Sequence, residues 1–479
     1  MHAGLRWSQC ADRTTLLLLV SVTRFCSSGG TVASPAGVSA LSSYFGTKTR
    51  YEDVRTELLV DPLWTPAPDT ALPPSCVPLQ MVGVIRHGTR YPTRKQIRKM
   101  QTVHRLVGSA GGTQSTLVQE LRNWHMWYDD WMDGQLVRKG ELDMEHLAAR
   151  MASTFPSLLT RERLRRCQRS FITSSKHRCV DSAKAFIRGL ERSYRGHPEL
   201  DMQDMPCSVP VINDNLMRFF DHCERFVTYI ENNDTAMHQV DAFKEGPEIK
   251  RVLEKMGALL NVPVKDLNAD LVQVAFFTCS FELAINSVNS PWCSVFDEDD
   301  SKVLEYLNDL KQYWKRGYGY DINSKASCIL FQDIFKHLER AVTESKSSQP
   351  ISLPVVLQFG HAETLQPLLV LMGLFKDKEP LTASNFAKQS NRKYRSGRIV
   401  PYAANMVLVL YHCDHVKGNE EEYQVQMLLN EKPLAFPHSG RNIASYQELK
   451  GQYSDLLQGC NVTEECKRTQ TNETVVDEL

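Results

Sequence analysis

The sequence predicts an α/β protein in which a sheet domain is interrupted by an inserted helical domain. Three short apolar runs rich in β-branched residues are typical of buried strands. They cover residues 77–85, 351–359 and 405–411, near the two ends of the chain. The long region between the first two runs carries largely helical patterns. We therefore expect both ends of the chain to build one sheet.

The boundaries of these parts follow from where the patterns change. Residues 31–120 and 325–455 are predicted to form the sheet domain, and residues 121–324 the mostly helical insertion. The stretch from 31 to 75 is predicted to be loop-like because it ends in a run of prolines. Residues 456–479 are predicted to be a C-terminal tail.

Two clusters inside the predicted insertion attract notice but favour structural roles. Trp124, Trp127 and Trp131 recur at i, i+3 and i+7, so they are expected on one face of a helix, packed in the core rather than forming a platform for sugars. The acidic run Asp297 to Asp300 lacks the spacing of an EF-hand and is expected to be a solvated loop.

Composition excludes several classes of protein. The chain has 479 residues, 42% of them hydrophobic, with 56 Lys and Arg against 56 Asp and Glu. These values are ordinary for folded proteins and argue against disorder or a coiled-coil rod. With zero net charge, no global field holds the chain on nucleic acid or on a membrane surface. An acidic ligand would need a local cluster of cations.

Both termini carry signals for the secretory pathway. Arg6 and Arg13 precede an apolar run and then small residues, so residues 1–30 are predicted to be a signal peptide. No stretch is apolar for about 18 residues, so no membrane span is expected. The chain ends in VDEL (476–479), which resembles a KDEL-type retrieval signal. We expect the lumen of the endoplasmic reticulum as its address, with the retrieval receptor as partner and secretion as the alternative.

Sequons and cysteines agree with export. Asn233, Asn461 and Asn472 each begin an Asn-x-Thr glycosylation triplet. Eleven of the thirteen cysteines remain after loss of residues 1–30, and an odd number leaves at least one free thiol beside the disulfides. A pairing of Cys460 with Cys466 would close a small loop.

The loop after the first predicted strand carries the residues with the clearest chemistry. Arg86, Arg90 and Arg94 surround His87 within nine residues. The planar fork of arginine donates two parallel hydrogen bonds to phosphate oxygens, so the three suit a phosphate dianion. Adjacent positive charges disfavour the imidazolium form and would keep the histidine a neutral nucleophile. The alternative is a basic surface loop with an incidental histidine.

The other polar clusters are weaker. The second predicted strand is followed by Gly360 and by 361–364 (HAET), which opens a predicted helix over 365–375. The third predicted strand runs into 412–415 (HCDH), whose residue types suit a metal. Strand alternation sends neighbouring side chains to opposite faces, so we expect incidental polar residues there and no metal site.

The quoted motifs resemble one family. The segment 86–92 resembles the RHGxRxP motif of the histidine acid phosphatases, branch 2 of the histidine phosphatase superfamily. Residues 136–150 resemble the family's glycine-centred helix start, and 174–190 its Ser-x-x-x-Arg-x-x-x-Ser-Ala-x-x-Phe block. Most of the family has His-Asp where this chain has His361-Ala362-Glu363, the form found in its inositol polyphosphate phosphatases. The resemblance spans residues 76 to 450.

The resemblance implies a phosphoglycerate-mutase-like sheet domain with an inserted helical domain, and a role for each matched residue. His87 corresponds to the nucleophile that forms a phosphohistidine. Arg86, Arg90 and Arg178 correspond to the arginines that hold the phosphoryl group, and His361 to the histidine that also contacts it. Fixed cations can neutralise the charge that Mg²⁺ neutralises elsewhere, so no metal or other cofactor is implied.

Arg94 and Glu363 are the two remaining site positions. Arg94 stands where relatives carry a basic substrate-binding residue. With the usual aspartate missing, Glu363 is the best candidate for the group that protonates the leaving oxygen and later deprotonates water. The alternative is a carboxylate that only stabilises the start of a helix.

Inositol hexakis- and pentakisphosphate and 2,3-bisphosphoglycerate are the substrates that the resemblance implies. A polyphosphorylated substrate needs further cations, for which Lys95, Arg98 and Lys99 are candidates, together with the basic run 161–169. The alternatives are a broad-specificity lumenal acid phosphatase, a mutase, and a non-catalytic protein that binds phosphate ligands.

Overall fold

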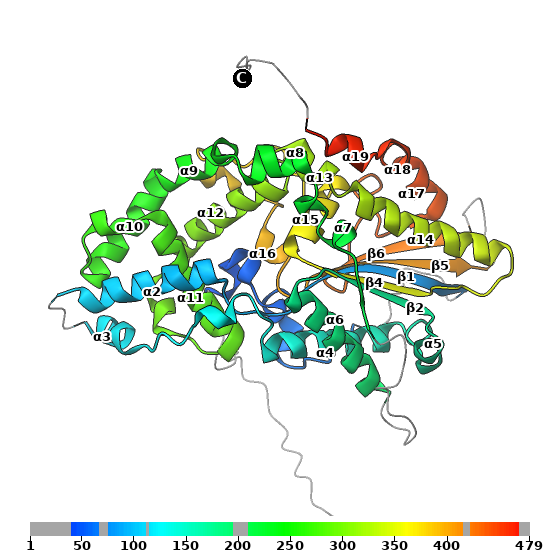
Figure 1. Ribbon diagram of the computed structural model, residues 1–479, viewed down its shortest axis with the longest axis horizontal. Coiled ribbons are helices and arrows are strands. Elements are labelled where there is room, and N and C mark those ends of the chain that lie inside the picture. The colour runs from blue at the N-terminus through cyan, green and yellow to red at the C-terminus, as the bar shows by residue number, and fades with distance from the viewer. Residues whose placement is uncertain (1–39, 67–74, 112–114, 195–208, 415–421, 469–479) are drawn as a thin grey trace, which may run out of the picture. The chain divides into compact units, whose positions relative to one another are not determined.

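An eight-stranded sheet runs through the residues that the computed structural model describes, which are 40–66, 75–111, 115–194, 209–414 and 422–468 (Figure 1). The strand order is β3-β2-β4-β1-β5-β6-β7, with β8 paired to β6. The strands are β1 (Cys76–Arg86), β2 (Arg169–Thr173), β3 (Val211–Ile212), β4 (Val355–Gly360), β5 (Asn405–Cys413), β6 (Tyr423–Leu429), β7 (Lys432–Pro433) and β8 (Ile443–Ser445). The predicted signal peptide, Asn472 and the VDEL ending lie outside the described residues.

The central strands are parallel, and this sets where the site lies. β3, β2, β4 and β1 pair in parallel, whereas β5 pairs antiparallel with β1 and with β6. The predicted strands at 77–85, 351–359 and 405–411 are confirmed as β1, β4 and β5. β4 begins later than predicted, just after Pro354, which has no N–H to contribute to the ladder.

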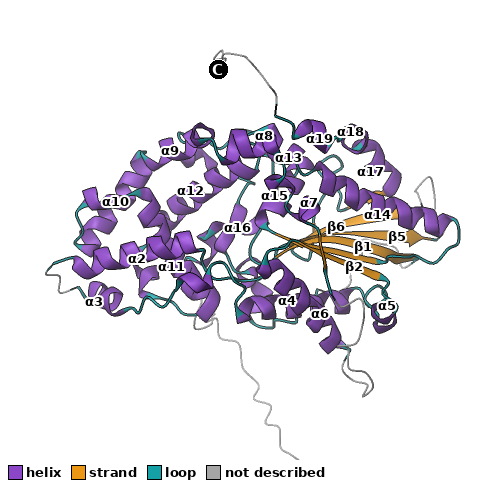
Figure 2. Ribbon diagram, viewed as in Figure 1, coloured by secondary structure: helices purple, strands orange, loops and turns teal. Residues whose placement is uncertain are grey.

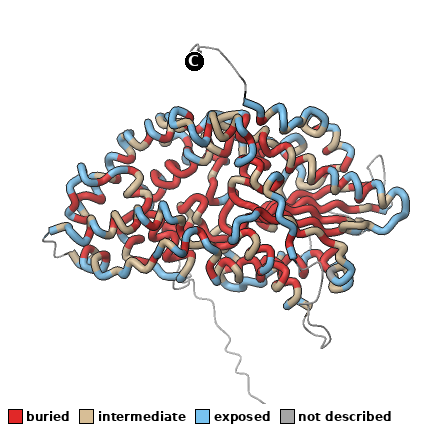
Figure 3. Tube along the Cα trace, viewed as in Figure 1, coloured by how far each residue is buried: buried red, intermediate tan, exposed pale blue. Residues whose placement is uncertain are grey.

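Both faces of the sheet are covered. Alternate residues of β1 point to opposite sides, so Met81 joins one hydrophobic cluster with residues of α4 and α6, while Val82 joins the cluster that includes α14 and α15. Figure 2 shows these helix pairs on the two sides of the strands. Burial on both sides explains why the central strands are apolar without alternation. Figure 3 shows them buried along most of their length.

The remaining described chain is mostly helical. The α-helices are α1 (Tyr51–Val54), α2 (Arg94–Ser109), α3 (Thr116–Asn123), α4 (Arg138–Thr154), α5 (Arg161–Arg165), α6 (His177–Ser193), α7 (Asp214–Met217), α8 (Glu224–Phe226), α9 (His238–Lys244), α10 (Pro247–Leu260), α11 (Ala269–Asn286), α12 (Glu298–Arg316), α13 (Asp321–Lys325), α14 (Cys328–Lys346), α15 (Ala362–Leu371), α16 (Ser396–Ile399), α17 (Tyr446–Gln452), α18 (Ser454–Gly459) and α19 (Val462–Glu465). None of these helices is long and apolar enough to cross a bilayer. Helices α2, α3 and α9 to α12 group beyond the carboxyl ends of the parallel strands (Figure 1).

The predicted boundaries do not separate the sheet from the helices. β2 and β3 lie within 121–324 and yet pair in the sheet, and α4 and α6 from the same range cover one of its faces. The error arises because β2 is short and polar at its start, so the sequence gives it no strand signal. Residues 37–479 form one compact unit by their contacts.

The stretch predicted to be loop-like up to residue 75 contains short helices. These are η1 (Ser42–Tyr44), η2 (Gly46–Lys48), α1 and η3 (Thr56–Leu59). Phe45 is buried and its ring lies 4.9 Å from that of Phe276 in α11. Tertiary packing of a few apolar residues therefore orders a segment whose own sequence shows no periodicity.

Two helical predictions within the described range also need correction. The helix expected at 365–375 runs from Ala362 to Leu371, because Gly373 adopts a left-handed conformation and ends it. The three tryptophans do not share a helix: α3 ends at Asn123. Trp127 stacks on Tyr128, and Trp131 is 59% exposed.

The acidic run at 297–300 is the N-cap and first turn of α12 rather than a loop.

The disulfides do not include the small loop that a pairing of Cys460 with Cys466 would close. Cys466 pairs with Cys223 and Cys460 with Cys328, which ties the C-terminal segment to two other elements. The remaining pairs with both ends described are Cys76–Cys413 and Cys279–Cys293. The predicted free thiol is confirmed in the described residues as Cys179, which is buried.

A buried ionic cluster anchors the segment that leads into β5. Arg392 donates to Asp309 at 2.6 Å and to Glu305 at 2.9 Å, both on α12. The N–H of Ser396 donates to the same Asp309 at 2.9 Å. All three ionic side chains are less than a tenth exposed. Because the cluster is closed, each charge depends on its partners being present.

We expect Arg392→Met to lower the free energy of unfolding by about 3–5 kcal/mol, since it leaves the buried Asp309 carboxylate without a cation, whereas Glu305 keeps its pairing with Arg395. Urea denaturation followed by circular dichroism measures the loss. The matched control is Lys302→Met on the outer face of the same helix, whose pairing with Glu298 is exposed to solvent and should contribute little. Equal stability of the two variants would contradict a supporting role for the cluster.

Candidate active site

Neighbouring parallel strands end side by side at the carboxyl edge of the sheet, the usual ligand position in open α/β folds. His87 directly follows β1, and His361 directly follows β4. Arg86 lies opposite Gly360 in the register, and the N–H of His87 donates to the Gly360 carbonyl at 3.0 Å. β2 brings Ser174 to the same edge. The structure thus brings together two residues that are far apart in the sequence and were both predicted for the site.

The state of His87 is fixed by one hydrogen bond and by its surroundings. Its Nδ1 lies 2.8 Å from the Gly88 carbonyl oxygen, which can only accept, so Nδ1 carries the proton and Nε2 keeps its lone pair. Burial, followed by the charges of Arg178 and Arg86, lowers the pKa of His87 well below its ordinary value. A neutral imidazole with a free Nε2 is the form required of a nucleophile.

The loop after His87 is held by α4 and α6. The Gly88 N–H donates to the Ser182 hydroxyl at 3.1 Å, and both the N–H and the hydroxyl of Thr89 donate to Asp143, at 3.0 and 2.6 Å. A Cβ on Gly140 would lie 2.0 Å from the Thr89 carbonyl oxygen. The glycine at the start of α4 is therefore required by the close approach of the two backbones.

Arginine side chains surround the histidine. Burial lowers the pKa of Arg86 to about 10, and its Nη1 donates to the carbonyls of Thr47 at 2.8 Å and Val400 at 2.5 Å. Within the described residues, the Nε atoms of Arg86, Arg90 and Arg178 are buried and have no hydrogen-bond partner. Buried donors without partners are rare and indicate a ligand that accepts from them. The structure thus brings together the three arginines predicted to hold a phosphoryl group.

His361 is occupied on both ring nitrogens. Arg178 can only donate, so the Nδ1 of His361 accepts from it at 3.3 Å, and Nε2 then donates to the Ser174 hydroxyl at 2.9 Å. Burial and the charge of Arg178 lower the pKa of His361 to about 3. In this state His361 is neutral and orients Arg178. Ser174, Arg178 and Ser182 are the defined polar positions of the matched block, and each has a partner in the site.

Glu363 lies in the first turn of α15, two residues beyond His361. Burial alone would raise its pKa, but the attraction of Arg316, a backbone hydrogen bond at Glu363 itself and the charge of Arg86 lower the pKa of Glu363 to about 2. The side chain is therefore a carboxylate in the free protein. Its negative charge in turn favours the charged form of Arg86.

The sequence prediction missed residues that the tertiary fold brings to the site. Lys48 is half-buried within the reach of Arg90, Arg86 and Glu363, and desolvation together with the two arginines lowers its pKa well below the ordinary value. Its ammonium lies 4.8 Å from the centroid of the Phe277 ring. No motif surrounds this lysine, so no signal in one sequence could have found it. Tyr402, beside His87, was missed for the same reason.

The cations predicted after the active-site loop line two neighbouring hollows, and Lys95 and Lys99 belong to both. Lys95 and Lys99 line a cavity of about 420 Å³ that also contains Lys244, Lys311 and Lys315. Phe277 lines it as well, so Lys48 lies between this cavity and the arginines. Arg94 and Arg98 line a shallower hollow of about 550 Å³ and approach Asp130 at 3.8 and 3.2 Å. Arg94 is more than half exposed and stands outside the group of three arginines.

The basic run 161–169 does not reach the site. It forms α5 and the first residue of β2, and Arg169 pairs with Val355 at the start of β4. In a parallel sheet these residues lie at the edge opposite to His87 and His361. Clustering in the sequence was misleading because it does not tell which end of a strand carries the charges.

Two of the three predicted glycosylation sites lie among the described residues. Asn233 is half-buried and lines the lysine cavity, whereas Asn461 is exposed at the N-cap of α19. In the described part of the 412–415 cluster, Cys413 is in a disulfide and His412 pairs with Glu422. No group of three potential metal ligands occurs among the described residues.

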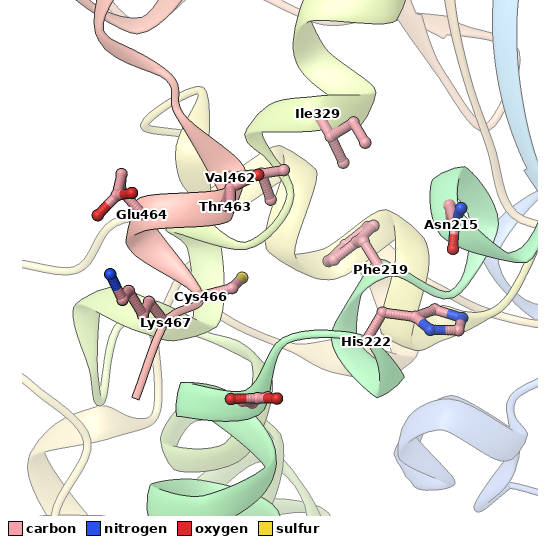
Figure 4. A pocket seen from close by; sticks show the side chains of 10 residues that line it. Asn215, Phe219, His222, Ile329, Val462, Thr463, Glu464, Cys466 and Lys467 are labelled. Carbon is pink, nitrogen blue, oxygen red and sulfur yellow. The ribbon is translucent and has the colours of Figure 1, made fainter. Parts of the chain in front are cut away.

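A separate hollow of about 550 Å³ lies between η6 (Phe219–Asp221), α14 and α19. Figure 4 shows Phe219 and His222 on one side of it and Val462 and Lys467 on the other. None of the residues predicted for the phosphoryl site lines it. It is therefore distinct from the arginine-lined site.

A neutral histidine among arginines, at the carboxyl edge of a parallel sheet, suits phosphoryl transfer through the imidazole. Residues 79–430 match the family model described as histidine phosphatase superfamily (branch 2), and the chain belongs to that superfamily. It is similar to multiple inositol polyphosphate phosphatase 1 of Homo sapiens, with 58% identity over 450 residues and 92% of each chain covered. The protein of the same name from Gallus gallus is 56% identical over 444 residues, covering 92% of this chain and 96% of that one.

Among solved structures, the phytase from D. castellii has a TM-score of 0.69 at 19% identity, covering 92% of this chain and 91% of that chain. This likeness shows the fold. The predicted α/β fold and the predicted family are both confirmed.

The low pKa of His87 predicts that acid does not silence the nucleophile. Because its folded pKa lies below the ordinary 6.5, the imidazole stays neutral as pH falls from about 7 to about 5. We expect kcat/KM for an aryl phosphate, corrected for ionisation of the substrate, to show no acid limb in this range. In Arg178→Gln the largest neighbouring charge is gone, so the acid limb should move to higher pH. An acid limb near 6.5 in the wild type would contradict the assignment.

Proposed function

We propose that this chain is a phosphomonoesterase that hydrolyses inositol polyphosphates, among them inositol hexakis- and pentakisphosphate, through a phosphohistidine on His87. The observation that carries the proposal is the free Nε2 of a neutral His87 surrounded by arginine Nε donors without partners. The names of two similar proteins, both multiple inositol polyphosphate phosphatases, support inositol polyphosphates as the substrate class.

The reaction divides into two transfers. The Nε2 lone pair attacks phosphorus while the bond from phosphorus to the ester oxygen breaks, and the leaving oxygen takes a proton. Water then attacks the phosphohistidine, the P–N bond breaks, and phosphate leaves. Arg86, Arg90 and Arg178 offset the charge on the equatorial oxygens in both steps. The N-terminus of α15 adds its positive dipole end beside the same group.

Glu363 is the candidate for both proton transfers, but it is ionised in the free protein, whereas the first step needs it protonated. As a carboxylate it can deprotonate water in the second step. To protonate the leaving oxygen it must first gain a proton, and a bound phosphate offsets the arginines that hold its pKa low. Binding of the substrate therefore raises the pKa of Glu363 toward the value that an acid requires.

The lysine cavity supports a substrate with several phosphates. Lys99 pairs with Asp270, and Lys315 with Glu231, at 2.6 and 2.8 Å. Lys95 and Lys311 also line the cavity and have no ion pair within the described residues. Burial and repulsion from Lys315 and Lys244 lower the pKa of Lys311, so an anion beside it would be stabilised. We infer that Lys48, Lys95 and Lys311 contact the phosphates that do not react.

We include 2,3-bisphosphoglycerate as a second substrate, because the same cations can bind the two phosphate groups of this smaller molecule. A mutase would return the phosphoryl group to an organic acceptor, and release of inorganic phosphate separates the two. A non-catalytic binding protein would give no product at all. A broad-specificity lumenal acid phosphatase would show no preference for substrates with several phosphates.

We further propose the lumen of the endoplasmic reticulum as the site of action, with retrieval through VDEL and secretion as the alternative. Four disulfides with both ends described favour an oxidising compartment. A glycan on the exposed Asn461 is compatible with the fold, and one on Asn233 would stand at the rim of the lysine cavity. Removal of residues 476–479 should send the protein into the medium, and unchanged retention would contradict the retrieval signal.

The roles of the two catalytic side chains are tested by substitution. We expect His87→Ala to lower phosphate release from inositol hexakisphosphate at least about 10⁴-fold, and Glu363→Gln to lower it about 10²-fold. EDTA should leave the wild-type rate unchanged. With p-nitrophenyl phosphate, whose leaving group needs no proton, Glu363→Gln should still release nitrophenol in a burst and accumulate the phosphoenzyme. The control is Glu379→Gln at an exposed position. Undiminished release by His87→Ala would end the proposal.

The lysine contacts are tested by charge removal. The pair Lys95→Met and Lys311→Met should raise KM for inositol hexakisphosphate at least about tenfold, the equivalent of one charged hydrogen bond. The dependence of KM on salt should become shallower, while turnover of p-nitrophenyl phosphate stays unchanged. The control is Arg161→Gln with Arg165→Gln at the opposite edge of the sheet. An unchanged KM in the lysine variant would contradict this assignment.

A further inference from the structure

Tyr402 lies beside the nucleophile and is held there by its backbone. It follows α16, and its N–H donates to the Thr49 carbonyl at 3.0 Å. The next residue, Ala403, has a left-handed backbone with φ of 59° and donates its N–H to the His87 carbonyl at 3.1 Å. A non-glycine residue in that conformation is uncommon and is kept where surrounding contacts determine it. The contacts here fix the tyrosine against the end of β1.

The ring of Tyr402 is part of the wall of the site. The centre of the Arg86 guanidinium lies 4.7 Å from the ring centroid, within cation–π range. The His87 ring lies 6.2 Å away, centroid to centroid. The side chain is fully buried. The ring therefore supports Arg86, but this contact uses only the aromatic face and leaves the hydroxyl unexplained.

The hydroxyl of Tyr402 has no hydrogen-bond partner in the described part of the chain, although it is buried. A buried, unpaired polar group destabilises a fold, so a group of this kind beside a ligand site indicates that the ligand supplies its partner. The positive charges that act on this phenol are those of Arg90, Arg86 and Arg178, the same three side chains whose Nε atoms lack partners, and Asp143 acts in the opposite sense. The Tyr402 hydroxyl and the three arginine Nε atoms are therefore four unpaired polar atoms in one part of the site.

These four groups do not satisfy one another in the structure, and a single ligand can satisfy all of them. Guanidinium N–H groups only donate, and the phenol donates as long as it keeps its proton. Burial raises the pKa of Tyr402 even though the three arginines oppose this, so the proton stays at neutral and acidic pH. A phosphoryl group offers several acceptor oxygens and no donor that competes.

We propose that Tyr402 is a further catalytic residue, whose hydroxyl donates a hydrogen bond to a non-bridging oxygen of the transferring phosphoryl group. The inference rests on the proposed function and adds a neutral donor to the three arginines. Its contribution is largest in the transition state, where charge is spread over the equatorial oxygens and a fixed donor needs no reorganisation.

Tyr402→Phe removes the hydroxyl and keeps the ring against Arg86. We expect kcat to fall roughly tenfold for both inositol hexakisphosphate and p-nitrophenyl phosphate, less than the loss of a donor from a site that has only one or two. KM for either ester should change less than kcat. Inhibition by orthovanadate, which mimics the five-coordinate transition state, should weaken by about the same factor as kcat.

The matched control is Tyr394→Phe. Tyr394 is also buried, but its hydroxyl donates to the Gln312 carbonyl at 3.2 Å, outside the site. Its removal should lower the melting temperature slightly and leave kcat and vanadate inhibition unchanged. Should Tyr402→Phe fail to fold, a fluorinated tyrosine at 402 keeps the shape and makes the phenol more acidic, so the alkaline limb of activity should move to lower pH.

Wild-type kcat and wild-type vanadate inhibition in Tyr402→Phe, or an alkaline limb that does not move with the fluorinated residue, would overturn the inference. It would then be the ring alone that matters. Failure of the proposed function looks different: the wild type itself would release no phosphate from either ester. Orthovanadate binding to the wild type and to Tyr402→Phe would still decide whether the hydroxyl meets a phosphate-like ligand.

Discussion

The structure depends on one electrostatic constraint: three guanidinium groups must be held close to one another and to a histidine, in a place largely removed from water. Like charges in such a place repel and lose hydration, and the fold offsets only part of both effects before an anion binds. The surrounding fold supplies the restraint. The backbone carbonyls of Thr47 and Val400 accept hydrogen bonds from Arg86, and His361 accepts one from Arg178. The carboxylate of Glu363 favours the charged form of Arg86. Burial and the charges of the same arginines keep His87 neutral, so affinity for phosphate and nucleophilicity have one physical origin.

The restraint is assembled from distant parts of the chain. Thr47 belongs to the short helices before β1, and Val400 to the segment that the buried pair of Arg392 and Asp309 anchors on α12. A helical region and a sheet meet at the site in this way, and neither could form it alone. The glycine contact at the start of α4 and the hydroxyl of Ser182 set the position of the loop between them.

Much of the centre could be predicted from the sequence, and the reason is local. β1 and β4 are short apolar runs that end in glycine-containing polar segments, so His87 and His361 could be assigned to strand ends. Arg178 was found only through its motif, because an arginine in the first turn of a helix has no signal of its own. β2 and Lys48 were out of reach, since one strand is short with a polar start and the lysine acts through contacts made over long separations.

The prediction that the basic run 161–169 binds substrate was wrong for the opposite reason. The run is conspicuous in the sequence, but the direction of β2 places it at the other edge of the sheet. The disulfide partners of Cys460 and Cys466 could not be read from the sequence, because proximity along a chain competes with pairing across the fold. Where a residue acts through its neighbours in sequence, one sequence was sufficient. Where it acts through neighbours in space, it was not.

The position of β1 at the middle of the sheet has a consequence for how the protein is made. Its partners in the ladder, β4 and β5, are synthesised long after it, and Cys76 must wait for Cys413, 337 residues later. At ordinary rates of translation, about 5–20 residues per second, the first strand stays unpaired for tens of seconds. During that time an apolar segment is open to wrong partners, so a nascent chain of this kind depends on chaperones until its last strands emerge.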